Sequence, residues 1–193
     1  MPGSVLFFER QGVSIAPRFL RRDHRQQNME KIITYECPKS FLIGYMFEKI
    51  LIATDGSKYS QKAAEKGIEM AKLTNSQIIV LYVADEGRYY SLGDMGFSRA
   101  DDVIKGIRNS ILQEGDAAVK TIEAMAKAAW VPVQSRVVEG NPANQILKVA
   151  EEAQAKLIVM GRIGRTGLER YLLGSVAEKV VRNSRTPVMV VHG

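Results

Sequence analysis

A glycine-rich segment directly after an apolar run is the part of this sequence best suited to chemistry. Gly161, Gly164 and Gly174, followed by Ser175, give the spacing Gly-x2-Gly-x9-Gly-Ser. Glycine permits backbone conformations with positive φ and carries no Cβ that would keep a ligand from the backbone. Phosphate oxygens bind to exposed N–H groups, most readily at the N-terminus of a helix. The segment therefore predicts a phosphate-binding loop, with a further hydrogen bond from the Ser175 hydroxyl.

The loop has neither the Walker A sequence nor the Gly-x-Gly-x-x-Gly fingerprint, so a flexible strand–helix connection is the alternative. Asp55 favours the ligand site, because it also lies just beyond an apolar run, with Thr54 between them. In open parallel sheets, ligands bind outside the carboxyl ends of the strands, where the strand order reverses. Two local roles stay open beside ligand contact: Asp55 could hold a turn through backbone N–H groups, and Ser175 could cap a helix.

Strand-like and helix-like segments alternate from Lys49 onward. Apolar runs predict five short strands, at residues 50–53, 78–83, 131–138, 157–160 and 188–191. Apolar residues at helical spacing predict four helices between them. These helices begin after Ser57, over residues 100–129 (weakened locally by Gly106 and Gly115), at Pro142 and near Gly174. Such alternation is typical of a doubly wound α/β domain, with a parallel sheet between two layers of helices.

The first 45 residues differ in composition from the rest of the chain. They contain seven Lys or Arg against four Asp or Glu, and no matching strand–helix period. We therefore expect an N-terminal extension over residues 1–45 and one nucleotide-binding domain over residues 46–193. Cys37 is the only cysteine, which excludes an internal disulfide and fits a reducing cytoplasm.

Composition also narrows the classes of partner. The formal net charge is +6, but no basic stripe interleaves with aromatic residues as in proteins that bind single-stranded nucleic acid. We expect no nucleic-acid partner. No stretch of the sequence is long and apolar enough to span a membrane, so we expect no membrane partner either.

The segments at residues 50–57, 140–142 and 160–176 together resemble the universal stress protein family in its ATP-binding branch. The resemblance covers about residues 47–192, and the Gly-x2-Gly-x9-Gly-Ser spacing is complete. It implies a Rossmann-like five-stranded parallel sheet of order 3-2-1-4-5, similar to adenine nucleotide alpha hydrolases. It also implies that ATP binds, with Mg²⁺ or Mn²⁺ accompanying the phosphates.

The same resemblance implies roles for particular residues. Asp55 would bind the ribose or a phosphate-linked metal. The remaining positions would contact the nucleotide: Ala53 and Thr54 along it, Val83 at adenine, Met160 and Gly161 at base and ribose, and Gly164, Gly174, Ser175 and Val176 at the phosphates. Arg162 and Arg165 lie where family members vary, and they are candidates for phosphate contact.

Groups that could catalyse rapid turnover are few. The only histidines are His24 and His192, near opposite ends of the chain, and no zinc-ligand spacing occurs. This favours an ATP-binding stress-response switch, with at most slow hydrolysis, that acts on a protein partner of unspecified identity. The alternatives are a nucleotide hydrolase or nucleotidyl transferase, and a structural dimer with an empty loop.

The fifth predicted strand suggests how the protein assembles. In the order 3-2-1-4-5 it lies at a sheet edge, and Val188, Met189, Val190 and Val191 carry no charge. An exposed apolar edge invites pairing with another chain. We therefore expect a homodimer through this strand, as the family resemblance also implies. The alternative is that residues 1–45 cover the edge and leave a monomer.

Overall fold

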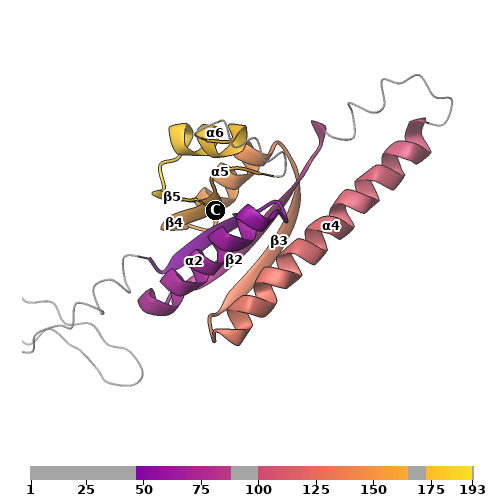
Figure 1. Cartoon of the computed structure of the whole chain (residues 1–193). Helices are drawn as coiled ribbons and strands as arrows, with labels where there is room; N and C mark the ends of the chain where they lie inside the picture. Colours follow the sequence, from indigo (N-terminus) through magenta and orange to yellow (C-terminus); the bar gives the residue numbers. More distant parts are fainter. Residues whose placement is uncertain (1–46, 88–99, 165–172, 193) are drawn as a thin grey trace, which may run out of the picture. The chain divides into compact units, whose positions relative to one another are not determined.

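The computed structural model describes residues 47–87, 100–164 and 173–192 (Figure 1). Five strands form one sheet in which every pairing is parallel. Their order is β3-β2-β1-β4-β5, which confirms the predicted fold. The strands span Lys49–Thr54 (β1), Gln77–Asp85 (β2), Val133–Gly140 (β3), Leu157–Gly161 (β4) and Val188–Val191 (β5).

Four helices cover the two faces of the sheet (Figure 1). Helices α2 (Lys58–Thr74) and α4 (Ala100–Ala128) pack on one face, and α5 (Pro142–Glu152) and α6 (Ser175–Asn183) on the other. Strands β1, β2 and β4 contribute buried residues to both cores, because successive side chains of a strand point to opposite faces. This explains why their sequences are continuous apolar runs without alternation.

Helix α4 runs without interruption through both of its interior glycines. A Cβ at Gly115 would lie 2.5 Å from a ring carbon of Tyr82, whereas nothing lies within 4 Å of the corresponding position at Gly106. Gly115 therefore lets the helix approach the buried Tyr82 ring on β2. The sequence indicated only a local weakness at this position.

An unusual residue lies in the turn directly after helix α4. Trp130, the only tryptophan of the chain, adopts a φ of 60°. Its N–H donates to the carbonyl of Lys127, and its side chain is 93% exposed. Bulky residues rarely adopt a positive φ, and glycine or asparagine is the usual residue at such a helix end.

The strand order reverses between β1 and β4. β1 pairs with β2 on one side and with β4 on the other, with Ala53 opposite Met160 at the carboxyl ends. The chain reaches β2 and β3 through α2 and α4 on one face, then crosses to β4 and β5 through α5 and α6 on the other. A crevice is expected at such a switch point.

Within residues 47–87, 100–164 and 173–192, no helix is long and apolar enough to cross a bilayer. The expected extension over residues 1–45 lies outside the described residues, as does Arg165.

Candidate functional site

A cavity of about 290 Å³ opens at the carboxyl ends of β1, β2 and β4. This volume lies near the lower limit of about 300 Å³ for ordinary small-molecule pockets. Of the twelve predicted binding residues, eleven line the cavity, and the twelfth is Arg165. Those eleven are Ala53, Thr54, Asp55, Val83, Met160, Gly161, Arg162, Gly164, Gly174, Ser175 and Val176.

Asp55 lies in the turn between β1 and α2. Its Oδ1 accepts a hydrogen bond from the Ser57 amide at 3.0 Å. Asp55 therefore holds the turn through a backbone N–H group, which was its expected local role. Gly56 follows with a φ of 80°, a conformation that favours glycine. Asp55 also faces the glycine loop, since a Cβ built on Gly164 would lie 2.8 Å from its Oδ2. The two predicted motifs therefore meet in one crevice.

The N-terminus of α6 is built differently from those of α2 and α5. Ser57 caps α2 by accepting from the Ser60 amide, and Asn141 caps α5 by accepting from the Asn144 amide. At α6 the N-cap is Gly174, with no side-chain capping bond. The role of Ser175 as a helix cap was therefore wrong, because Ser175 is the first residue inside the helix. The helix start thus has no side-chain cap, and Gly174 and Ser175 line the cavity. The N-terminus of a helix attracts anions.

The loop before α6 is held by backbone contacts. The Arg162 amide donates to the carbonyl of Val191, and the Gly174 amide donates to the carbonyl of Arg162. A Cβ on Gly174 would lie 3.3 Å from that same carbonyl oxygen. Glycine at this position thus lets the start of α6 approach the end of β4.

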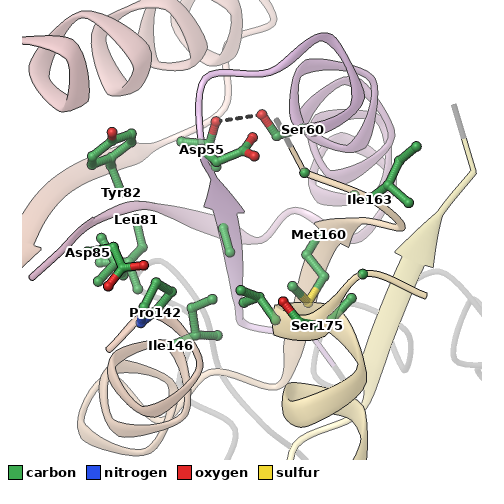
Figure 2. Close-up of a pocket in the computed structure, with 18 of the residues that line it drawn as sticks. Asp55, Ser60, Leu81, Tyr82, Asp85, Pro142, Ile146, Met160, Ile163 and Ser175 are labelled. Carbon is green, nitrogen blue, oxygen red and sulfur yellow. Dashed lines mark hydrogen bonds between the residues drawn. The ribbon is translucent and has the colours of Figure 1, made fainter. Parts of the chain in front are cut away.

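Eight further residues line the cavity that were not among the predicted binding residues: Ser60, Leu81, Tyr82, Asp85, Pro142, Ile146, Ile163 and Ala177. Asp85, Pro142 and Ile146 group together on one side, and Asp55 and Ser60 on another (Figure 2). Asp85 could have been found, because it is an acidic residue at the end of a predicted strand, as Asp55 is. No comparable signal marks Ser60, which occupies an ordinary helical position.

Three or more metal-ligating side chains do not gather anywhere among the described residues. Asp55 and Asp85 are the carboxylates that line the cavity. A metal at this site would therefore need further ligand oxygens, such as those of phosphates. The role of Asp55 as a metal ligand stays a prediction.

Comparison with known proteins gives a consistent result. The sequence profile of the universal stress protein family matches residues 46–192. Universal stress protein MJ0531 of Methanocaldococcus jannaschii is 40% identical over 146 residues, which cover 76% of this chain and 82% of that protein.

Two solved structures are similar in fold. Protein MJ0577 of the same organism has a TM-score of 0.67 at 30% identity, over 77% of this chain and 97% of its own. A universal stress protein in complex with cAMP has a TM-score of 0.54 at 26% identity, over 76% and 97% of the two chains.

Proposed function

The chain belongs to the universal stress protein family, and from this premise we propose that its domain binds ATP as a stress-response switch. The observation that carries the proposal is the uncapped N-terminus of α6, which opens on the same cavity as Asp55. Backbone N–H groups at a helix start attract phosphate through their partial positive charge.

The proposed pose follows the shape of the cavity. The base lies near Val83, where Pro142 and Ile146 supply apolar contacts. The phosphates lie against Gly164 and Ser175, with Arg162 lining the same cavity. Arg165 remains a candidate for phosphate contact. A nucleotide complex occurs among the relatives, since one solved universal stress protein holds cAMP.

The proposed role of Asp55 is to bind the ribose or a metal that accompanies the phosphates. Mg²⁺ and Mn²⁺ suit carboxylate and phosphate oxygens, and Mg²⁺ is usually bound through one or two carboxylates together with substrate phosphates. Bound metal would neutralise phosphate charge beside the carboxylate, and Asp55 would fix its position.

The direct test is calorimetry with ATP, AMP and cAMP, each with and without Mg²⁺, together with acid extraction of nucleotide from the purified protein. We expect ATP to bind more tightly than AMP or cAMP, because only ATP brings a β- and γ-phosphate to the start of α6. Asp55→Asn should keep the bond from the Ser57 amide but lose the charge, and with it the gain in affinity that Mg²⁺ gives.

Asp116→Asn is the matched control, because Asp116 is exposed on α4 and does not line the cavity. Wild-type protein that neither carries nucleotide nor binds added ATP would refute the proposal. Steady ATP turnover that Asp55→Asn abolishes would favour the nucleotide hydrolase or nucleotidyl transferase instead.

Binding, with at most slow hydrolysis, is the proposed behaviour of the site. Rapid phosphoryl transfer requires a positioned water and groups that stabilise the transferring charge. Among the residues that line the cavity, Asp55 and Arg162 are the candidates for those tasks. A switch whose nucleotide state is read by a partner protein in the cytoplasm needs no faster chemistry.

We also propose a homodimer through β5. This strand is at the end of the sheet order, and all four of its residues are half-buried apolar side chains. Antiparallel pairing with β5 of a second copy across a two-fold axis would satisfy its unpaired backbone groups.

Val190→Lys should place a charge in this seam and shift the mass in light scattering from dimer to monomer. Val103→Lys is the matched control, because Val103 is already 52% exposed on α4. A wild-type monomer at micromolar concentration would contradict the proposed dimer.

A further inference from the structure

The turn that carries Asp55 is closed by a chain of buried hydroxyl groups. The Thr54 Oγ1 accepts from the Gly56 amide at 3.1 Å and lies 2.9 Å from the Ser60 Oγ. Figure 2 marks the bond to Ser60 with a dashed line. The Ser60 Oγ is 2.9 Å from the carbonyl oxygen of Ser57. Thr54 and Ser60 are both buried.

The donor and acceptor of each bond follow from elementary counting. A hydroxyl has one proton to donate, and a carbonyl can only accept, so the Ser60 proton points to the carbonyl of Ser57. The proton between the two hydroxyls must then belong to Thr54. Bonds therefore run in one direction, from the Gly56 amide through Thr54 and Ser60 to the carbonyl of Ser57.

This series of hydrogen bonds surrounds the backbone turn that carries Asp55. It begins at the amide directly after Asp55 and ends at the carbonyl of Ser57, whose amide donates to the Asp55 carboxylate. The Ser60 amide also donates to the Ser57 hydroxyl, so Ser60 holds the turn through both its backbone and its side chain. Chains of hydrogen bonds in buried sites strengthen one another.

We infer that Ser60 is a positioning residue for Asp55: its hydroxyl fixes the 54–57 turn so that the carboxylate meets the nucleotide or its metal. The inference rests on the proposed ATP site and adds a residue to it. Ser60 acts through the turn, so its loss weakens binding only while the Asp55 carboxylate contributes to it.

The first experiment needs no nucleotide. In Ser60→Ala, amide hydrogen exchange at Gly56 and Ser57 should become about three- to ten-fold faster, as expected for the loss of a hydrogen bond of ordinary net strength. Ser60→Thr keeps the hydroxyl and should restore slow exchange. If Ser60→Ala does not fold, Thr54→Val removes the same bond from its other partner. Exchange is then compared at Ser57 alone, because this variant also takes the acceptor of the Gly56 amide. Unchanged exchange in the folded variant would overturn the inference.

The second experiment is a double-mutant cycle measured by ATP calorimetry with Mg²⁺. Ser60→Ala should raise the Kd for ATP about three- to ten-fold in the wild-type background. It should have little further effect in the Asp55→Asn background, because the carboxylate that it positions is already neutral. Additive losses would mean that Ser60 acts independently of Asp55, and the inference would fall.

Ser76→Ala is the matched control. Ser76 is also a buried serine that bonds to a threonine hydroxyl, that of Thr74, but it lies at the amino end of the sheet, before β2. It should lower stability without changing the Kd for ATP. Wild-type protein that binds no ATP would refute the proposed function, whereas an unchanged Kd in Ser60→Ala beside a binding wild type would refute the role of Ser60 alone.

Discussion

Gly164→Ala should weaken ATP binding by moving the Asp55 carboxylate. The added Cβ would lie 2.8 Å from the Asp55 Oδ2, and ordinary van der Waals contacts begin at 3.4 Å, so the carboxylate must move by about 0.6 Å. Gly164 does not adopt a positive φ, since the glycines that do are Gly56 and Gly140 among the described residues. The effect of the alanine is therefore steric contact and not backbone strain.

The size of the effect follows from the bonds of that carboxylate. The Ser57 amide donates to the Asp55 Oδ1 at 3.0 Å. If the whole carboxylate moves away by about 0.6 Å, this distance exceeds hydrogen-bond range. Hydrogen bonds to charged groups are worth about 1.5–3 kcal/mol net, and solvent at the half-buried turn reduces that figure for folding. We expect stability to fall by about 1 kcal/mol, and the affinity for ATP to fall about ten-fold or more if the same carboxylate contacts the ligand.

The assay pairs urea unfolding with ATP calorimetry, and Gly106→Ala is the matched control. Nothing lies within 4 Å of a Cβ at Gly106, which is inside α4. That alanine should stabilise the fold by about 0.8–1 kcal/mol through helix propensity and leave ATP affinity unchanged. A folded Gly164→Ala protein with wild-type affinity would refute both the close contact with Asp55 and its role in binding.

Three further outcomes are expected. A chain shortened to begin at Met46 should fold and keep its ATP-dependent rise in melting temperature, and loss of folding would mean that the extension contributes to the domain. Gly115→Ala should lower the free energy of unfolding by about 1–3 kcal/mol in urea, because its Cβ would lie 2.5 Å from the Tyr82 ring. The pKa of Glu123 is lowered by its hydrogen bond and charge pair with Lys127. Its contribution to stability is therefore present above the ordinary glutamate pKa and is lost as the pH falls through the lowered pKa. Any advantage of wild type over Glu123→Gln in urea unfolding should disappear below that pH.

The elements and their order could be predicted because they depend on local pattern. Apolar runs and the residues at helix starts, such as Asn141 before Pro142, show in the sequence itself. The glycine spacing and Asp55 likewise predicted the edge of the sheet where the cavity opens. Strand ends differed by one or two residues, as with β3, which begins at Val133 and not at residue 131.

What could not be predicted depends on contacts between distant segments. Tyr82 stands in a continuous apolar run, and such a run does not tell which side chains face which layer of helices. Its contact with Gly115 joins residues far apart in the sequence. From the sequence alone, Gly115 could therefore be interpreted only as a residue that weakens the helix. Ser60 was missed because the hydroxyl chain needs the end of β1 and the first turn of α2 in register.

The exposed Trp130 decides how this protein can be observed in solution. Its indole is already surrounded by water in the folded state, so intrinsic fluorescence should change little in wavelength when the chain unfolds. It also stands at the end of α4 before the start of β3, whereas the cavity opens at the carboxyl ends of the strands. Fluorescence from this single indole is therefore a poor reporter of both unfolding and nucleotide binding. Trp130→Phe would supply a dark background, against which a tryptophan introduced elsewhere could be read without interference.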